Sequence, residues 1–512
     1  MARALARGEE RLSDSLRGLL RDRLWRIDGK AREILPWAAA LGRAFTAETL
    51  ESVCPLPTAE LLAGLEELER HAILRVVEAG FDFTHDLLRL AAYQQISAPR
   101  CRLVHRQIAR SLAALPDGDG ALAAEVSHHA ALGSEHELAA AAAVTAGERC
   151  LRLFAPAEAA ELAERGLHHL GTLAGPVRLR LHMALLKIYV HSALGRGRSQ
   201  EVARELAQLV EEARAAGLHA QVQAGLYLLS VLSEERGDFA AAQRHTLQAA
   251  ELSRDADPAT AARALGNTGR CLAQLEREHS RALALLVEAD ELARRAGIEI
   301  IDIPWGLGLT SQFAGEEEPA IRYLEGALAL ALRHQDHWAE CECMARLGQI
   351  DLEGGRPAAV LARTPELRRV AAKLGEGSEA PLAEALEALA RLALGESGAD
   401  ERLEEALDRL RAIDTKGLLA YVQNLAAEWD LRGGQCGHLE RARRRAEEAL
   451  GAAAAVDRRS QIALARCCLA RCALLAGDAT GAGAHLEALA AAAAEPDRLN
   501  ARARRAIADL QG

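Results

Sequence analysis

A histidine and an aspartate stand together where an extended stretch of the chain is expected to turn into a helix. His85 and Asp86 follow "GFDFT" and precede "LLRLAAYQQ". A histidine near a helix N-terminus is able to donate a hydrogen bond to a phosphate, and the free backbone amides there also favour anions. The alternative role is structural, with Asp86 capping the helix and His85 tying the extended stretch to it. The sequence leaves both roles open.

Several other residues are of types that bind metal ions, but their spacing is wrong for a metal site. Zinc sites need paired CxxC sequences or histidines at set distances from cysteines. Neighbouring histidines on a helix point about 100° apart and seldom share a metal. We therefore predict no metal site, and packing roles for the cysteines. The groups concerned are Cys341-x-Cys343, Cys467-Cys468-x3-Cys472, His128-His129 and His168-His169.

Common sequence motifs of catalytic sites are absent from the chain. There is no G-x-x-x-x-G-K-[ST] loop to hold a triphosphate; "IDGKAR" has Gly-Lys without the earlier glycine or a following hydroxyl residue. No Gly-x-Ser-x-Gly and no H-E-x-x-H occurs either. We predict a protein that is not an enzyme, with no catalytic residues and no cofactor of its own, which argues against an ATPase acting alone.

The composition excludes several classes of protein. The 512 residues carry a net charge of -11, which argues against a general binder of nucleic acids or anionic membranes. No apolar run reaches the roughly 18 residues that a spanning helix needs. The N-terminal "MARALARGEERLSDSL" lacks the apolar core of a signal peptide. We expect a cytoplasmic protein with reduced cysteines.

Most of the chain consists of repeated pairs of helical patterns. "GDFAAAQRHTLQAA" begins with a turn at Gly237 and continues with Ala242 and Ala249, and similar turns recur about every 40 residues. A glycine just past a helix adopts a left-handed conformation at little cost and ends the helix. Recurrence at such a period is typical of a helical solenoid. The recurring turns lie at Gly237, Gly315, Gly355, Gly434 and Gly477.

These units resemble tetratricopeptide repeats (TPRs), and Gly237-Asp238-Phe239-x-x-Ala242 carries the resemblance best. The period is longer than the usual one of about 34 residues, so HEAT-like pairs stay open as an alternative. Both alternatives give an all-α fold that is an α-solenoid of helical hairpins. We predict units at 121–170, 178–216, 221–254, 259–296, 303–334, 338–373, 381–413, 418–455 and 460–491, with a last helix near 496–510.

Residues 1–115 have a different pattern. Amphipathic helical stretches lead to "ILRVVEAGFDF", where β-branched residues, a turn and alternating phenylalanines predict one β-hairpin. Helices followed by a hairpin are typical of a small winged-helix domain. Its recognition helix would be about 58–71, where four glutamates would repel DNA phosphates. We predict a winged-helix-like domain at 1–115, repeats at 116–495 and a capping helix at 496–512, and DNA binding is the weakest alternative.

The stretch "FDFTHDLLRLAAYQQISAPRCRLVHRQIARSL", with "ILPWAAALGRAFTAETLESV" before it, resembles the winged helix of STAND-type signalling ATPases. The likeness is to bacterial regulators of the LuxR, AfsR and cyclase-associated kind, in which a P-loop core, this winged helix and tetratricopeptide repeats follow one another. It implies that the chain corresponds to the part after the ATPase core. In that family the histidine at this helix start is expected to reach the β-phosphate of ADP, so the resemblance implies nucleotide sensing by His85 with Asp86 as its helix-start partner, although Thr84 replaces the usual methionine.

The leading hypothesis is therefore a non-catalytic regulatory module. The resemblance implies that the winged helix docks on a P-loop ATPase module, and that ATP or ADP comes only with that partner. The solenoid would bind a protein or a small inducer on its concave face. The alternative is a free-standing scaffold with no link to a nucleotide. Trp305, Trp338 and Trp429 lie in first helices of units and are expected more often in the core than in the groove.

Overall fold

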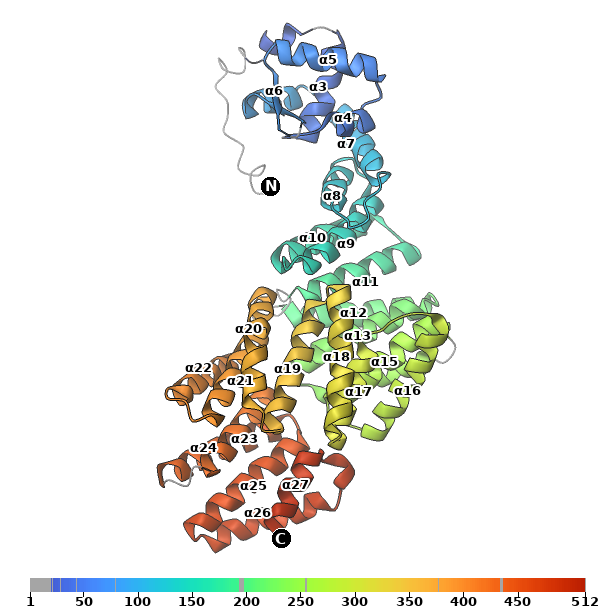
Figure 1. The fold of residues 1–512 in the computed structure, drawn as a ribbon. Helices are drawn as coiled ribbons and strands as arrows, with labels where there is room; N and C mark the ends of the chain where they lie inside the picture. Colours follow the sequence, from blue (N-terminus) through green and yellow to red (C-terminus); the bar gives the residue numbers. More distant parts are fainter. Residues whose placement is uncertain are drawn as a thin grey trace. The chain divides into compact units, whose positions relative to one another are not determined.

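The computed structural model describes residues 20–511 apart from 21, 28, 43, 79, 193–197, 254–255, 376 and 433–435. These residues form an all-α structure with one two-stranded sheet, as the sequence predicts (Figure 1). The chain divides into an N-terminal unit, Met1–Arg149 with Glu161–Leu185, and a C-terminal unit, Cys150–Ala160 with Leu186–Gly512. The predicted helix that starts near residue 10 and the turn at Gly434 lie largely or wholly outside the described residues.

None of the helices in the described ranges is both long enough and apolar enough to cross a membrane.

The N-terminal unit contains three helices, a β-hairpin and a further series of helices, of which α9, α10 and α11 cross its boundaries. Its elements are α3 (Gly29–Leu41), α4 (Ala47–Val53), α5 (Thr58–Arg70), β1 (Leu74–Val77), β2 (Gly80–Phe83), α6 (Asp86–Gln94), α7 (Ala98–Ala113), α8 (Ala123–Leu132), α9 (His136–Arg152), α10 (Pro156–His168), η1 (Leu170–Thr172) and α11 (Gly175–His191).

The predicted hairpin is present. β1 and β2 pair antiparallel with Leu74 opposite Phe83 and Val77 opposite Gly80. Phe45 forms an isolated antiparallel bridge with Phe81, so the segment before α4 extends this small sheet. One face of the hairpin packs on a core shared by α3, α5, α6 and α7. The order of helices and hairpin is the one expected, and the winged-helix assignment itself stays a prediction.

The C-terminal unit is a succession of antiparallel helix pairs. Its elements are α12 (Ser199–Ala215), α13 (His219–Glu235), α14 (Phe239–Leu252), α15 (Pro258–Gln274), α16 (His279–Ala296), α17 (Asp302–Ala314), α18 (Glu317–His334), α19 (His337–Glu353), α20 (Pro357–Leu374), α21 (Glu379–Ala393), α22 (Ala399–Ala412), α23 (Lys416–Arg432), α24 (Cys436–Ala455), α25 (Arg459–Ala476), α26 (Ala479–Ala493), η3 (Pro496–Arg498) and α27 (Ala501–Gln511).

Each predicted unit from residue 221 to 491 corresponds to one of these helix pairs, from α13 and α14 to α25 and α26. The glycines predicted to end first helices have the expected left-handed backbone, with φ of 73° at Gly237, 89° at Gly315 and 75° at Gly477. The last predicted helix, 496–510, is a 3-10 turn at Pro496–Arg498 followed by α27 from Ala501.

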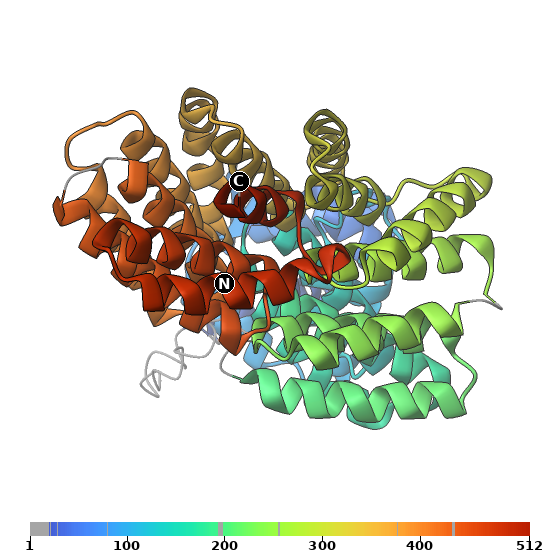
Figure 2. The ribbon, with the colours of Figure 1, turned by 90° about the horizontal axis from the view of Figure 1, so that it is seen from below.

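The two helices of a pair are buried differently. α16 buries Ala282, Leu286, Ala289 and Ala293, which lie three or four residues apart on one face. α15 buries nearly every residue from 261 to 273, so it has neighbours on several sides. First helices such as α15, α17 and α19 therefore form an inner layer, and the second helices cover it on one side (Figure 2).

Repeats far apart in the sequence touch across this inner layer. Arg277, just after α15, forms an ion pair at 3.3 Å with Asp457, just before α25. The guanidinium of Arg458 lies 5.1 Å from the ring centre of Phe239 and donates to the backbone oxygen of Gln274. The row of repeats thus curves until segments about 180 residues apart are in contact, and the first helices enclose a common interior.

Candidate functional site

A cavity of about 60 Å³ lies inside the C-terminal unit, where first helices and α27 converge. The residues that line it come from the ends of α15, α17 and α19, from α23 and α25, and from α27. They are Ala273, Gln274, Glu276, Leu309, Gln312, Phe313, Arg346, Gln349, Glu353, Tyr421, Gln461, Asn500, Arg502 and Arg505. Eleven of these fourteen side chains are polar or charged, so the cavity is a polar site built by distant repeats.

Amide side chains recur around this cavity at the period of the repeat. Gln274, Gln312 and Gln349 are 38 and 37 residues apart, and Gln461 and Asn500 are 39 residues apart. Gln423 falls on the same spacing but bonds to Glu448 and is not in the lining. We call the five lining residues Gln274, Gln312, Gln349, Gln461 and Asn500 the amide ladder. Each repeat that contributes to the amide ladder supplies one side-chain amide able to form hydrogen bonds with a peptide bond.

Arginines hold the oxygens of two ladder amides. Arg270 donates from Nη1 to Oε1 of Gln274 at 2.7 Å. Arg346 donates from Nη1 to Oε1 of Gln349 at 3.0 Å. A guanidinium only donates, so these contacts fix which end of each amide is the oxygen. Within the described part of the chain, the NH2 group of both glutamines has no acceptor.

Two further ladder amides are held in the same way. Asn424 donates from Nδ2 both to the backbone oxygen of Gln461 and to its Oε1, each at 2.9 Å. The backbone oxygen only accepts, which fixes the orientation of Asn424 and therefore that of Gln461. Asn500 uses its Oδ1 to accept the backbone N–H of Ala503 at 2.9 Å and so caps α27. The NH2 groups of Gln461 and Asn500 have no acceptor among the described residues.

Two other donors in the lining also lack an acceptor. The Tyr421 hydroxyl has no partner in the described structure, although the residue is only 7% exposed. Arg502 donates from Nη2 to Glu428 at 2.7 Å, while its Nη1 is 3.8 Å from Glu353 and has no hydrogen bond. An unpartnered buried donor costs on the order of 1–3 kcal/mol, so a cluster of them is a reason to look for a ligand.

The charges of the lining leave a positive surplus. Arg346, Arg502 and Arg505 face the carboxylates of Glu276 and Glu353. Arg346 and Arg505 form no ion pair within the described ranges, and Glu276 interacts with Arg458 just outside the lining. Burial raises the pKa of Glu353, although Arg502 opposes this. The raised pKa further weakens the negative charge of the Glu353 carboxylate.

A layer of aromatic and charged residues continues the inner layer along α15, α17 and α19. The Arg270 guanidinium lies 4.7 Å from the ring centre of Trp305 and donates to Asp302 at 2.6 Å. Trp305 is buried as predicted, and Trp338 is partly buried beside it with ring centres 5.3 Å apart. Burial raises the pKa of Glu342 in the same layer to about 7, although Arg346 opposes this.

The cavity has the features of a binding site. A search of the residues that the structure describes finds no group of three histidine, cysteine or acidic residues able to hold a metal ion. The cysteines of the predicted groups, Cys341, Cys343, Cys467, Cys468 and Cys472, are buried and unbridged, as expected for packing residues. The lining offers fixed hydrogen-bond donors and a surplus of positive charge, which are able to bind and orient a ligand.

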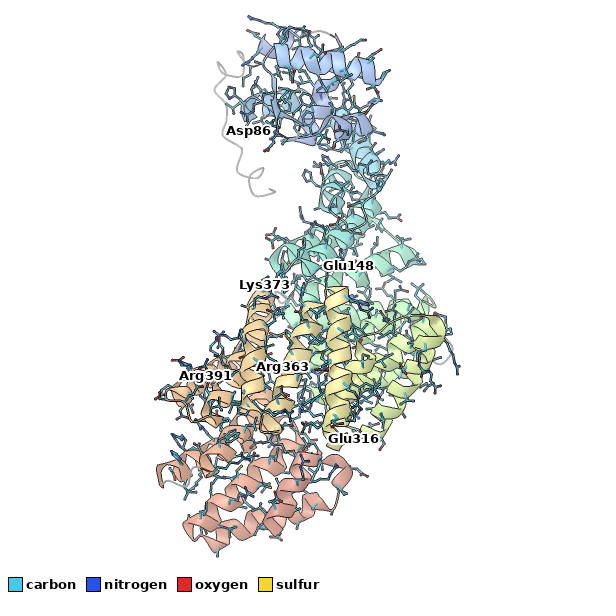
Figure 3. The ribbon with its side chains drawn as sticks, in the orientation of Figure 1. Asp86, Glu148, Glu316, Arg363, Lys373 and Arg391 are labelled. Carbon is cyan, nitrogen blue, oxygen red and sulfur yellow. The ribbon has the colours of Figure 1, made fainter. Side chains whose placement is uncertain are left out.

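The residues predicted to sense a nucleotide lie elsewhere, in the N-terminal unit. His85 is the N-cap residue of α6, exposed, and its side chain makes no capping hydrogen bond. Asp86 is the first residue of the helix and forms an ion pair at 3.6 Å with Arg89 (Figure 3). Thr84, which stands where a methionine was expected, donates to the backbone oxygen of Ala72 at 2.7 Å and fastens the hairpin.

The adjacent histidines His128 and His129 of α8 lie in different surroundings. His129 is buried and its Nδ1 lies 2.7 Å from Nδ1 of His105. His128 instead lines a second cavity, of about 300 Å³, with Ser127, Ala131, Arg165, His168 and His169. In that cavity Nδ1 of His168 bonds to the oxygen of Glu164, and Nδ1 of His169 bonds to His136. These nitrogens are therefore used within the protein.

The ladder was missed at the level of the sequence, although a signal for it exists. Glycine and alanine spacing defined the units, and the glutamines that repeat at 37–39 residues were not aligned with them. That signal is the spacing alone, because Gln274, Gln312 and Gln349 lie at different distances from the ends of α15, α17 and α19. The joining of these residues with α27 depends on the curvature of the solenoid, which the spacing does not contain.

No family model matches this chain, and no curated protein matches it. Solved structures do match. A Rap protein complexed with competence and sporulation factor has 14% identity, with 71% of this chain and 95% of that chain covered, at a TM-score of 0.48. Aspartyl phosphate phosphatase F from Bacillus subtilis has 14% identity, with 71% and 90% covered, at 0.37.

A STAND protein with a tetratricopeptide repeat sensor, from Pyrococcus horikoshii, has 13% identity and a TM-score of 0.38. The match covers 93% of this chain and 64% of that one, so this chain spans less than two thirds of its length. All three TM-scores are below 0.5, and the function proposed below rests on the residues of this chain.

Proposed function

We propose that this chain is a non-catalytic regulatory protein of the cytoplasm, and that its C-terminal unit binds an extended peptide segment of a partner protein along the inner layer of first helices. The observation that carries the proposal is the amide ladder. Its members, Gln274, Gln312, Gln349, Gln461 and Asn500, line one cavity and come from five different elements.

An extended peptide presents backbone N–H and C=O groups at regular intervals, and it needs polar partners when it is buried. Amide side chains repeated once per helix pair supply such partners along a path. The aromatic and charged layer of Arg270, Trp305 and Trp338 supplies a contact surface next to it. Rigid helices hold these groups in place before binding, which reduces the ordering cost on the protein side.

The test uses the full chain, immobilised and incubated with a library of random 12-residue peptides, and bound peptides are identified by mass spectrometry. We expect retention of a restricted set of sequences. The variant Gln349→Ala should lose about tenfold in affinity for them, because one fixed hydrogen-bonding group is removed from the path.

Gln208→Ala is the matched control, because Gln208 is exposed on α12, in the same unit but outside the cavity lining. It should leave peptide retention unchanged. Retention of no peptide above the background of the bare support would overturn the proposal. Equal losses for both variants would place the binding outside the inner layer.

A second candidate function concerns the N-terminal unit, which would dock on a P-loop ATPase module and sense its nucleotide through His85 and Asp86. The resemblance to STAND-type ATPases motivates it. The placement of His85 supports it, because an exposed imidazole at a helix N-terminus, free of any capping bond, is available to a phosphate group.

The full chain and a purified P-loop module of a STAND-type ATPase provide the test of this second candidate. Binding should strengthen when the module carries ADP, and His85→Ala should remove that dependence while leaving the unfolding midpoint of the chain unchanged. A module that ignores the chain with and without ADP would dispose of this candidate and leave the peptide-binding proposal standing.

A further inference from the structure

We infer that the cavity binds a single carboxylate group carried by the bound peptide, an inference that rests on the proposed function and specifies the chemistry of its ligand. The inference comes from which hydrogen-bonding groups of the lining are already used and which are left. It concerns the amide ladder, Tyr421 and the three lining arginines.

Most unpaired groups of the lining are donors; the exceptions are Oε1 of Gln312, whose Nε2 donates to Glu353 at 3.4 Å, and Oε2 of Glu276. The oxygens of Gln274, Gln349, Gln461 and Asn500 each accept a hydrogen bond from the protein, so their NH2 groups are what a ligand meets. The Tyr421 hydroxyl and Nη1 of Arg502 add two more donors. A carboxylate only accepts, through two oxygens with about four lone-pair positions, and it is the natural complement of such a set.

The charge of the lining fits one negative charge. Three arginines face two glutamates, which leaves a surplus of one positive charge. In the described structure Arg502 is paired with Glu428, and Glu276 interacts with Arg458 outside the lining, so the surplus comes from Arg346 and Arg505 against Glu353. A phosphate dianion would exceed this surplus and would meet Glu276 and Glu353 as well, so the site favours a carboxylate over a phosphate.

The size of the cavity agrees with a small group. About 60 Å³ is room for several water molecules or for a carboxylate, and it is far below the volume of a drug-sized ligand site. The rest of the peptide would therefore lie along the inner layer, with its carboxylate in the cavity. That carboxylate has two possible sources, the C-terminus of the peptide and an aspartate or glutamate side chain.

The direct test titrates the full chain with N-acetylglycine, which carries a carboxylate, and with N-acetylglycinamide, its neutral counterpart, and follows binding by saturation-transfer NMR. N-acetylglycine should bind and the amide should bind at least about tenfold more weakly. Inorganic phosphate is the competitor. Equal binding of acid and amide, or tighter binding of phosphate than of N-acetylglycine, would overturn the inference.

Two variants locate the binding. Gln349→Glu turns a donor into an acceptor while keeping the bond to Arg346, and Arg505→Gln removes the surplus charge. Each should reduce N-acetylglycine binding by about tenfold. Gln208→Glu on α12 and Arg402→Gln on α22 are exposed controls that make the same chemical changes outside the lining, and they should have no effect.

Peptide libraries then separate the two sources and separate this inference from the proposed function. Selective retention of a free-acid library over an amidated one assigns the C-terminus, and selective retention of acidic sequences assigns a side chain. Equal retention of amidated libraries without aspartate or glutamate would overturn the carboxylate inference and keep peptide binding. Retention of no library would overturn the proposed function, while N-acetylglycine would still report on the cavity itself.

Discussion

The two units of the molecule bury polar side chains in opposite ways. The N-terminal unit buries neutral groups that bond to one another, with His105 and His129 only 1% and 2% exposed. The C-terminal unit buries full charges, such as Arg445 and Asp430 at 3% and 2%, and leaves donors unused around its cavity. The bonded groups of the N-terminal unit stabilise the fold, whereas the unused donors of the C-terminal cavity are able to bind a ligand.

The buried hydrogen bonds of the N-terminal unit form a series in which every donor and acceptor can be assigned in one direction. Cys101 donates to Tyr93 at 3.1 Å, and Tyr93 then donates to Nε2 of His105 at 2.7 Å. His105 therefore carries its proton on Nδ1 and donates it to Nδ1 of His129 at 2.7 Å. The remaining proton of His129, on Nε2, points toward Glu125 at 3.8 Å. Every internal member is satisfied, so the chain has a structural role.

In the C-terminal unit, a buried ion-pair network leaves one donor unused, Nε of Arg445, whereas the cavity leaves several. Arg445 binds Asp430, Asp400 and Glu404 at 2.6–2.8 Å and joins α22, α23 and α24. The donors around the cavity have no such partners in the described chain. The several unused donors gathered around one cavity are a reason to look for a ligand there.

Breaking the buried ion-pair network of Arg445 should have the largest effect. Arg445→Leu leaves Asp430 buried with Arg441 as its remaining partner, and leaves Asp400 short of one. Loss of one member of a buried ion pair typically costs about 3–5 kcal/mol. We expect a decrease of that size in the free energy of unfolding of the C-terminal unit, measured by urea denaturation followed by circular dichroism.

The control lies two residues away on the same helix. Arg443 forms an exposed pair with Glu447 at 3.0 Å, and exposed pairs of that kind contribute little to stability. Arg443→Leu should therefore be nearly neutral. Similar losses for the two variants would mean that the buried network does not stabilise the unit beyond an ordinary helix surface.

Acid should weaken the N-terminal unit. Burial lowers the pKa of His105 to about 3, with contributions from His129 and His128, while the unfolded residue titrates near 6.5. The unfolded state then binds more protons below pH 6.5, so stability is present above that pH and is lost as the pH falls toward 3. Between pH 6.5 and 5 the loss should be on the order of 2 kcal/mol, measured by hydrogen exchange of the α7 and α8 amides.

His105→Gln keeps hydrogen-bonding capacity and removes the titration, so it should flatten this pH dependence. The exposed His85 provides the control, and His85→Gln should leave the dependence intact. A pH dependence that survives in His105→Gln would assign the acid sensitivity to other groups.

The sequence allowed the elements to be predicted better than the site. Glycines such as Gly237 and Gly315 end helices because of their own backbone freedom, a local property visible in the sequence. The hairpin before Asp86 likewise follows from local β-branched and turn residues. The cavity joins Gln274 to Arg505, more than 200 residues apart, and depends on the angle accumulated between repeats. That angle arises from packing of many side chains, so period alone did not predict it.

The two units should respond to pH in opposite directions. Burial raises the pKa of Glu342 to about 7 from an ordinary value of 4.5. The folded state then binds the extra proton, so the contribution to stability is fully present below pH 4.5 and is lost as the pH rises to 7. Glu342→Gln keeps a neutral side chain at every pH and should stabilise the C-terminal unit at pH 8 by on the order of 2 kcal/mol.

The same Glu342→Gln variant should be nearly neutral at pH 4, where the carboxyl group of the wild type is also protonated. Urea denaturation at the two pH values measures the difference. Glu384, on the neighbouring α21, forms an exposed ion pair with Arg409, and Glu384→Gln should show no such change of sign with pH. An equal effect of Glu342→Gln at both pH values would contradict the raised pKa.

The smallest effect on stability should come from one unpaired hydroxyl group of the cavity lining. Tyr421→Phe removes a hydroxyl that has no partner in the described structure, so the free energy of unfolding should stay within about 1 kcal/mol or rise. Binding of N-acetylglycine should fall at the same time, because that hydroxyl is a donor to the carboxylate. Tyr323→Phe, on the exposed face of α18, should change neither quantity. Unchanged binding in Tyr421→Phe would remove this hydroxyl from the site, whereas a large loss of stability would mean that it belongs to a stabilising network like that of Arg445.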